Sequence, residues 1–379
     1  MVLLMIAFEG FTIVLYFALI LTVPGFDQRS TSRIIVLSAN DEKMDYSAYA
    51  RIVAEDLVRL KRRIQNSGIP DKVIDQNLII GTWNIRAFGE VFKSWGENQA
   101  SPKRNYRAMV YIAEIVRRFD VLAIQEVKRD TSGLRMLMDE LLGPNWGLVI
   151  SDVSAGSKGN TERLTFVYDK RRVQPSGLAG EIVLPPTADG NPAQQFDRTP
   201  YIVGFQTARE KFSLLTAHIR YGKNPADRIG EITALAQNIA SEVRQRATAG
   251  TEEGNLIVLG DFNIDERGEN PLFKAFVSTG LVVPEQLLNL KSTYDTKPKY
   301  YDQIAWFMDR LNLSFSEKAG VVDFAGAVYK ELSLIDMSYR LSDHFPLWAE
   351  FIVDRSTENM ARVLGIDPGM PDPFNTIPD

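Results

Sequence analysis

The chain has 379 residues, of which 45% are hydrophobic and 24% are charged, proportions typical of a globular protein and not of a disordered one. The net charge of −5 argues against a protein that coats nucleic acid by general electrostatic attraction. The absence of cysteine excludes disulfides, zinc–thiolate sites and cysteine nucleophiles. There are two histidines, His218 and His344.

The first segment, residues 2–24, is apolar except for Glu9. About 20 apolar residues can cross a bilayer as a helix, so we predict a membrane anchor within residues 1–24. No basic residue precedes the segment, which disfavours a signal peptide; a buried helix is a further alternative. Arg29 and Arg33 follow it, which favours a cytoplasmic body by the positive-inside rule. A membrane-associated location is therefore favoured, with a secreted or a cytoplasmic protein left open.

The next segment, residues 25–76, reads as a helical N-terminal extension. Apolar residues recur at helical spacing over residues 43–66, which predicts an amphipathic helix. We expect this helix to pack on the main domain or to act as a spacer, and a partner-binding helix is the alternative. At the other end, residues 354–379 contain four prolines and are predicted to form a loosely packed tail.

Between residues 77 and 353, short apolar runs alternate with helical patterns, which predicts one large catalytic domain. Strands are expected at residues 77–85, 120–127, 163–173, 201–208, 211–219, 255–263, 300–308 and 345–353. Helices are expected at residues 104–119, 133–142 and 224–247. This mixture of hairpins and crossover helices predicts an α/β fold in which two mixed sheets pack together with helices outside.

Polar residues interrupt these apolar strands near their ends, where α/β sheets commonly build ligand sites. Taken singly, each residue is readily explained as a turn or cap residue. Their joint occurrence, with both histidines of the chain among them, favours a functional site. The residues are Asn84, Glu126, His218, Asp261, Asn263, Asp302, Asp343 and His344.

The carboxylates of Glu126 and Asp343 and the side-chain oxygen of Asn84 are hard ligands. Such ligands suit Mg²⁺, Mn²⁺ or Ca²⁺ better than zinc. Asp302 and His344 can form a carboxylate–imidazole pair, which makes the histidine a competent base.

Three further residues complete a set for phosphoryl chemistry. His218 can donate a proton to a phosphate oxygen or a leaving group. Asp261 and Asn263 lie two residues apart, so they face the same side of an extended segment and could hold a second metal or orient the attacking water. The whole set predicts metal-assisted hydrolysis of a phosphate ester.

The ordered set of motifs resembles the endonuclease/exonuclease/phosphatase superfamily, and specifically its deoxyribonuclease I branch. The matching pieces occur in the family order and cover roughly residues 77–353. They read TWNIRAFG (82–89), VLAIQEVK (121–128), TERLTFVY (161–168), DRTPYIVGF (197–205), LLTAHI (214–219), VLGDFN (258–263), YYDQIAW (300–306), VVDFAGAVY (321–329) and LSDHFPL (341–347). The resemblance implies a four-layer α/β/β/α sandwich with two mixed sheets.

The resemblance also implies a divalent cation and its ligands. Glu126, with Asn84 and Asp343 nearby, would hold Mg²⁺ or Mn²⁺, with Ca²⁺ as a possible additional ion. Two hydrogen-bonded catalytic pairs are implied, one of His344 with Asp302 and one of His218 with Glu162. The role of Glu162 is suggested by the resemblance alone.

Contacts with the substrate are implied for four more positions. Asp261 and Asn263 would contact the scissile phosphate or the water, and Arg198 would grip the phosphate. Asn84 is also a candidate substrate-binding residue. Lys128 falls where deoxyribonucleases have an arginine that reads the groove.

The sequence departs from the deoxyribonuclease pattern at two positions. Gln303 stands where deoxyribonuclease I has arginine, and Asn160 falls near the place of a tyrosine that stacks on a sugar. Basic residues near the motifs could neutralise backbone phosphates, although scattered solvated charge is the alternative reading. They are Lys103, Arg104, Arg107, Lys128, Arg129, Arg171, Arg172, Arg220 and Lys223.

The leading hypothesis is a divalent-metal-dependent phosphodiesterase, an endonuclease that hydrolyses DNA with a water activated by the His/Asp pairs. The expected partner is nucleic acid, DNA in the first place, with membrane association through residues 2–24 and a monomeric state. The alternative is a phosphatase or phospholipid phosphodiesterase of the same fold at a membrane. A catalytically inactive scaffold or binding module is the third reading.

Overall fold

The computed structural model describes residues 3–8, 11–16, 44–45, 51–154, 160–246, 255–294, 297 and 299–366. It separates into two compact units, Met1–Lys43 and Met44–Asp379.

The first unit contains two strands, β1 (Leu3–Phe8) and β2 (Phe11–Tyr16), which pair antiparallel. The predicted apolar anchor helix therefore differs from the structure in these residues. The second strand, with the sequence FTIVLY, is rich in β-branched and aromatic residues, which favour strands. Among the described residues no helix is both long and apolar enough to cross a bilayer. The residues that follow the hairpin lie outside the described ranges, and membrane attachment stays a prediction.

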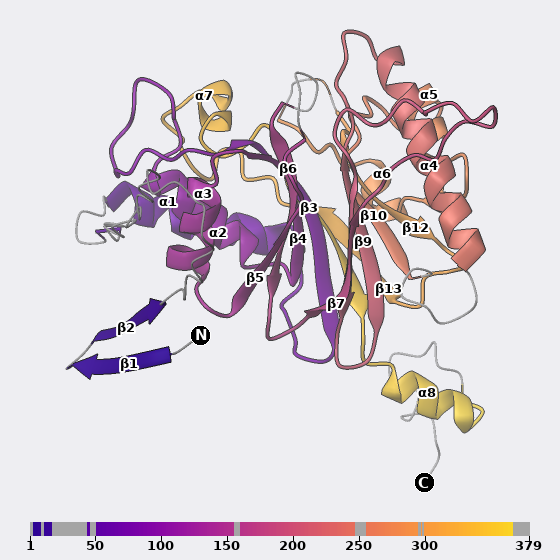
Figure 1. Ribbon diagram of the computed structural model, residues 1–379, viewed down its shortest axis with the longest axis horizontal. Helices are drawn as coiled ribbons and strands as arrows, with labels where there is room; N and C mark the ends of the chain where they lie inside the picture. Colours follow the sequence, from indigo (N-terminus) through magenta and orange to yellow (C-terminus); the bar gives the residue numbers. More distant parts are fainter. Residues whose placement is uncertain are drawn as a thin grey trace, which may run out of the picture. The chain divides into compact units, whose positions relative to one another are not determined.

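The second unit contains two six-stranded mixed sheets that pack face to face (Figure 1). The first sheet has the strand order β13 (Ser314–Val321), β14 (Leu347–Ile352), β3 (Asn77–Phe88), β4 (Val121–Lys128), β6 (Glu162–Asp169) and β5 (Trp146–Ile150). The second sheet has the order β11 (Leu281–Val282), β12 (Asp302–Phe307), β10 (Leu256–Asp261), β9 (Lys211–His218), β8 (Tyr201–Gln206) and β7 (Gln174–Glu181).

Helices cover the outer faces of both sheets (Figure 1). The first sheet is covered by α1 (Arg51–Asn66), α2 (Tyr106–Val116), α3 (Ser132–Arg135) and the π-helix η2 (Met136–Leu142). The second sheet is covered by α4 (Ala226–Arg246) and α5 (Pro271–Val277). The remaining short helices are α6 (Glu285–Leu288), α7 (Leu334–Ser338) and α8 (Ser356–Val363). The predicted four-layer α/β/β/α sandwich is confirmed.

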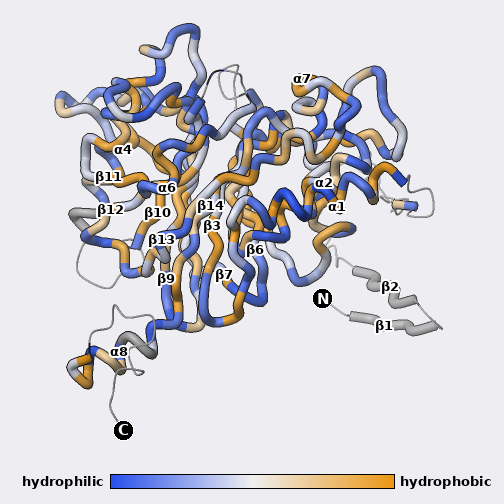
Figure 2. The backbone as a smooth tube through the Cα atoms, turned by 180° about the vertical axis from the view of Figure 1, so that it is seen from behind, coloured by the Kyte–Doolittle hydropathy of each residue, from blue (hydrophilic) through white to orange (hydrophobic). Residues whose placement is uncertain are grey.

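Strand β3 shows why the apolar runs do not alternate with polar residues. Leu78 and Ile80 belong to the core between the two sheets, whereas Ile79 and Trp83 belong to the core under α1 and α2. A strand that is buried on both faces needs apolar residues at nearly every position. In Figure 2 the central strands are accordingly coloured as hydrophobic over much of their length.

Two predictions differ from the structure in their helices. Residues 133–142 form one short α-helix and then a π-helix, in which the Gly143 amide donates to the Met138 carbonyl at 2.9 Å. The predicted tail contains α8, whose Ala361 is buried, and residues 367–379 lie outside the described ranges. The predicted helix over 43–66 is observed as α1, and residues 46–50 are not described.

Helix α1 belongs to the same compact unit as the two six-stranded sheets. Its Asp56 is fully buried and accepts hydrogen bonds from the Arg107 guanidinium at 2.5 Å and the Tyr111 hydroxyl at 2.7 Å. The backbone amide of Tyr329 donates to the same carboxylate at 3.1 Å. These contacts tie α1 to α2 and to the segment that leads into α7.

Strand register brings distant polar residues to one level. Asp261 on β10 lies opposite His218 on the parallel neighbour β9 and opposite Asp302 on the antiparallel neighbour β12. Gly260 allows this close approach, because its φ is +145° and an added Cβ would lie 2.2 Å from the Ala217 carbonyl oxygen. In the first sheet, Lys128 lies opposite Glu162 in the same way.

Candidate active site

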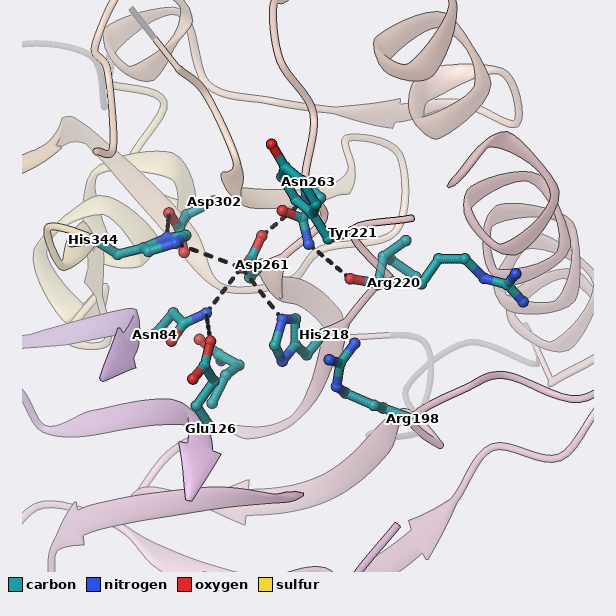
Figure 3. A network of polar contacts seen from close by, with 12 residues as sticks. Asn84, Glu126, Arg198, His218, Arg220, Tyr221, Asp261, Asn263, Asp302 and His344 are labelled. Atoms are coloured by element: carbon teal, nitrogen blue, oxygen red, sulfur yellow. Dashed lines mark hydrogen bonds and ion pairs between the residues drawn. The ribbon is translucent and has the colours of Figure 1, made fainter. Parts of the chain in front are cut away.

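The two histidines converge on one carboxylate oxygen (Figure 3). The Nε2 atom of His218 lies 3.6 Å from Oδ2 of Asp261, and the Nε2 atom of His344 lies 3.8 Å from the same oxygen. The two imidazoles come from different parts of the fold, one from the end of β9 and one from the loop before β14. The structure therefore brings together the two histidines and the aspartate that the sequence singled out.

A second carboxylate holds the other nitrogen of each imidazole. The Nδ1 atom of His344 lies 2.7 Å from Oδ2 of Asp302, and the Nδ1 atom of His218 lies 2.9 Å from Oε2 of Glu162. A carboxylate at Nδ1 fixes the ring orientation and favours the tautomer that carries a proton there. Both Nε2 atoms are thus directed towards the space beside Asp261.

Glu162 is held by two cations as well as by His218. Its carboxylate lies 2.8 Å from the Lys128 ammonium and 2.7 Å from the Nε of Arg198. Burial alone would raise the pKa of Glu162, but His218, Arg198 and Lys128 together lower it to about 2. The glutamate is therefore ionised at neutral pH and can stabilise a charged His218.

The other pair is more deeply buried. Burial by itself would lower the pKa of His344, but the carboxylates of Asp302 and Asp261 outweigh burial and raise this pKa well above its usual value. In the protein without a cation the imidazole therefore favours its protonated form. Positive charge bound nearby would lower the pKa of His344 and favour its role as a base.

Asp261 is the centre of the arrangement and is 1% exposed. Its Oδ2 accepts a hydrogen bond from Nδ2 of Asn84 at 2.9 Å, and its Oδ1 accepts one from the backbone amide of Asn263 at 2.8 Å. Burial raises the pKa of Asp261, yet the two imidazoles and these donors together lower it, so that the group is a carboxylate.

Asn263 shapes the loop beside this carboxylate. It adopts a left-handed backbone with φ of +51°, a conformation that asparagine tolerates better than most residues. Its side chain donates to the Ile219 carbonyl at 2.8 Å, directly after His218 (Figure 3). Asn263 therefore links the ends of β9 and β10 through its hydrogen bonds, in addition to any contact with substrate.

Glu126 lies at a bulge of β4, where its φ is +63°. Its Oε2 accepts from the Ala87 amide at 2.8 Å, and its Oε1 accepts from Nδ2 of Asn84 at 3.2 Å. This leaves the Oδ1 of Asn84, which is buried and has no hydrogen-bond partner among the described residues. A buried oxygen without a partner beside a carboxylate is what a hard cation such as Mg²⁺ would satisfy.

Two groups of side chains are close enough to hold a cation, with their ligand atoms within 4.8 Å of one another. In the described part of the chain these are Glu126 with Glu162 and His218, and Asp261 with Asp302 and His344. The Oδ1 of Asp302 is also buried and has no hydrogen-bond partner among the described residues. The donor set therefore fits a divalent cation.

Asp343, a predicted metal ligand, belongs to neither group. Its carboxylate lies 3.6 Å from an Nη of Arg86 and lines a pocket next to His344. The structure places Asp343 beside the site, and its role as a ligand stays a prediction.

Several basic residues expected on a phosphate-binding surface are buried instead. Arg104, Arg107 and Arg172 are exposed by only a few per cent in their side chains, and each is hydrogen-bonded inside the protein. The Nε and the η-nitrogens of Arg104 donate to the carbonyls of four residues, Arg86, Ala87, Arg340 and Leu341. The expectation of a surface phosphate contact is therefore wrong for these three arginines, because their hydrogen bonds are used within the fold.

Arg104 links two backbone segments that lead to residues of the site. It joins the backbone at Ala87, which donates to Glu126, to the backbone at Leu341, just before Asp343 and His344. No periodicity or motif in the sequence marks this contact, because the partners are backbone carbonyls far apart in the chain.

Two further residues fix the His344 backbone and were missed by the sequence reasoning. The Ser342 hydroxyl donates to the Asn84 carbonyl at 2.6 Å and accepts from the His344 amide at 3.0 Å. The Trp83 indole donates to the His344 carbonyl at 2.9 Å. Their positions next to Asn84 and within the SDH motif are the one signal that could have suggested them.

Comparison with known proteins places the chain in a family. Residues 81–275 match the model of the endonuclease/exonuclease/phosphatase family, which is about half of the chain. A deoxyribonuclease of Thioalkalivibrio sp. (strain K90mix) is 28% identical over 289 residues, which cover 73% of this chain and 71% of that protein. Deoxyribonuclease gamma of Rattus norvegicus is 29% identical over 196 residues, which cover 49% of this chain and 56% of that enzyme.

Solved structures with a similar chain path have low sequence identity. The human Nocturnin catalytic domain has a TM-score of 0.48 and 16% identity, and covers 74% of this chain and 95% of its own. Humanized TDP2 of D. rerio has a TM-score of 0.47 and 14% identity, and covers 73% of this chain and 98% of its own. The family match over residues 81–275, together with the deoxyribonuclease relatives, shows that this chain belongs to the endonuclease/exonuclease/phosphatase family of phosphoesterases and resembles its deoxyribonuclease I branch.

Proposed function

We propose that the protein is a divalent-metal-dependent endonuclease that hydrolyses phosphodiester bonds of DNA. One observation carries the proposal: two imidazoles, each steadied by its own carboxylate, direct their Nε2 atoms at the space beside Asp261. A phosphodiester in that space would have a proton acceptor on one side and a proton donor on the other, which is what displacement by water requires.

We propose a different role for each of the two histidines. We assign His344, paired with the buried Asp302, as the base that takes a proton from the attacking water. We assign His218, whose partner Glu162 is held ionised by Lys128 and Arg198, as the acid that protonates the leaving oxygen. Arg198 lies beside His218 (Figure 3) and is the candidate contact for a phosphate oxygen.

Glu126 and Asn84, with Asp343 as a further candidate, would hold the divalent cation. When bound, the cation would supply positive charge that stabilises the developing charge on the phosphate. Asp261 and Asn263 would orient the phosphate or the water between the two imidazoles.

DNA is the proposed substrate because proteins similar to this chain are named deoxyribonucleases. The match with the rat enzyme covers little more than half of that enzyme's length. A deoxyribonuclease activity of this chain is therefore a proposal. The Oδ1 of Asn84, which has no hydrogen-bond partner among the described residues, and the two groups of potential ligands support dependence on a cation such as Mg²⁺ or Mn²⁺.

The test is nicking of supercoiled plasmid by the full chain in Mg²⁺ or Mn²⁺. We expect nicking that EDTA abolishes and that Glu126→Gln lowers strongly, because the amide removes a charged ligand of the cation. Glu269→Gln is the matched control, since Glu269 is exposed and, among the described residues, forms its ion pair with Lys274. Nicking that persists in EDTA, or an equal loss in both variants, would contradict the proposal.

The runner-up, a phosphatase or phospholipid phosphodiesterase at a membrane, predicts a different outcome of the same assay series. It would be favoured by phosphate or headgroup release from phospholipid vesicles without plasmid nicking.

A further inference from the structure

A pocket of about 560 Å³ opens next to the catalytic histidine His344. This volume is within the range of sites that bind small organic ligands. The residues that shape it are Tyr294, Tyr301, Leu334, Ile335, Asp343 and His344. Because Asp343 and His344 form one wall, a group that fills this pocket lies directly beside the phosphate that is cleaved.

The other walls are aromatic and aliphatic. The Tyr301 ring lies 5.8 Å from the His344 ring at a tilt of 36°. Leu334 and Ile335 on α7 are 44% and 57% exposed, although they are large apolar residues. Part of α7 is orange in Figure 2, the colour of hydrophobic residues. Exposed apolar side chains that gather at a pocket beside an active site are typical of a ligand-binding surface.

A buried threonine also belongs to the lining of the pocket. Thr293 lines it, and the Oγ1 of this buried threonine has no hydrogen-bond partner among the described residues. A ligand with flat apolar faces would stack on the aromatic walls of the pocket, and a nucleobase has such faces.

Four of the basic residues near the motifs are engaged in hydrogen bonds or ion pairs within the protein. Arg104, Arg107 and Arg172 are used inside the fold, and Lys128 is paired with Glu162. Electrostatic contacts with phosphates usually provide most of the affinity for duplex DNA. Contacts with the bases would add to the affinity that the remaining basic residues provide.

We propose that this pocket, here called the base pocket (Tyr294, Tyr301, Leu334 and Ile335), binds the base of an unpaired nucleotide next to the scissile phosphate. The inference rests on the proposed function and names its substrate class as single-stranded or locally unpaired DNA. In a duplex both faces of a base are covered by its neighbours, so the base reaches such a pocket only after unstacking. Single strands expose their bases, and stacking on aromatic side chains then adds affinity.

The first test compares cleavage by the full chain of one labelled sequence in three forms: single strand, perfect duplex, and duplex with a short central bulge. We expect kcat/KM for the single strand to exceed that for the perfect duplex by about ten-fold or more. In the bulged duplex we expect cuts to concentrate at the bulge. Equal rates on single strand and perfect duplex, or no preference for the bulge, would overturn the proposal.

The second test separates base binding from damage to the catalytic centre. The single strand is prepared with and without a stretch of abasic residues, and cleavage is compared within and outside the stretch. For Tyr294→Ala we expect the ratio of cleavage at normal residues to cleavage at abasic residues to fall about ten-fold. A variant that only disturbed the active site would lower both rates and leave the ratio unchanged, which would overturn the proposal.

A matched pair of surface variants completes the design. Ile335 is 57% exposed in the base pocket, and Ile74 is 65% exposed away from it. Ile335→Ser should raise KM for the single strand, whereas Ile74→Ser should not change it. Hydrolysis of phospholipid vesicles that Ile335→Ser abolishes would assign the pocket to an acyl chain and overturn the proposal. Failure to cut any of the DNA substrates would contradict the proposed function itself.

Discussion

Two buried clusters of charged and polar side chains differ in how completely their hydrogen bonds are made. Around Asp56, both carboxylate oxygens have partners, which come from Arg59, Arg107, Tyr111 and the Tyr329 amide. At the histidine site, the Oδ1 atoms of Asn84 and Asp302 are buried and have no hydrogen-bond partner in the described part of the chain. The first cluster is complete within the described residues, whereas the second leaves acceptors that the proposed cation would satisfy.

This difference distinguishes charged groups that stabilise the fold from charged groups that serve the site. A satisfied buried network stabilises one arrangement of the fold. A network with free acceptors is costly for stability, and proteins keep such sites where a ligand or a cation supplies the missing partner. Substitutions in the Asp56 cluster should therefore change stability, and those at the histidine site should change activity.

The largest expected effect is on turnover at the histidine site. His344→Ala and His218→Ala should each lower kcat for plasmid nicking by about 10²–10⁴-fold, since each removes a proton-transfer group. The melting temperature should change little in comparison. A fall in activity of less than ten-fold for both variants would contradict the assignment of the two imidazoles.

The next effect is on stability at the other cluster. Asp56→Asn keeps the side-chain shape but leaves the Arg107 guanidinium with one charged partner fewer, and it should lower the free energy of unfolding by about 3–5 kcal/mol. Urea unfolding at neutral pH measures this. Specific activity per folded molecule should be close to that of the wild type. A loss of activity without a loss of stability would contradict the structural role of the Asp56 cluster.

A smaller effect tests whether Arg104 positions the cation ligands. Arg104→Lys keeps the charge but loses most of the four hydrogen bonds that join the Glu126 side to the His344 side. The Mg²⁺ concentration for half-maximal activity should rise roughly ten-fold, as for other residues that orient metal ligands.

The matched control for that substitution is Arg172→Lys. Arg172 is also a buried arginine, but it contacts Asp120 and the Asn77 carbonyl at the start of β3, away from the site. This control should lower the melting temperature without changing the Mg²⁺ requirement. The same shift of the Mg²⁺ requirement in both variants would leave Arg104 with a merely structural role.

The smallest effect is on stability in acid. Burial would raise the pKa of Asp169, but Arg171 and Lys72 lower it to about 2 from 3.8. A carboxyl with a lowered pKa stabilises the folded state above its unfolded pKa, and this stabilisation is lost as the pH falls through the folded pKa. Between pH values of about 4 and 2 the wild type should therefore lose more stability than Asp169→Asn, by at most about 2 kcal/mol. Parallel stability curves for the two proteins would contradict this.

The sequence predicted the elements and residues whose signal is local. Apolar runs located the main strands, and polar residues at strand ends identified Glu126, Asp261 and both histidines. Glu162 and Arg198 were suggested by family resemblance alone, because a glutamate and an arginine are common on surfaces.

Other features depend on contacts between distant segments, which no spacing in the chain encodes. The tie of Asp56 to Tyr329 joins residues 273 positions apart, and the hydrogen bond from Arg104 to Leu341 joins residues 237 positions apart. The base pocket likewise forms only when α7 lies beside the loop that carries Tyr294. The fold was thus predictable from pattern, whereas the support of the site became visible only in three dimensions.

The most direct test of the account is a crystal structure with Mn²⁺, with the ion located by its anomalous scattering. The account predicts a peak bound by Glu126 and the free Oδ1 of Asn84, with both imidazoles uncoordinated and still paired with Asp302 and Glu162. A peak coordinated by His218 or His344 would contradict it, because a histidine bound to the metal could not serve as the acid or the base.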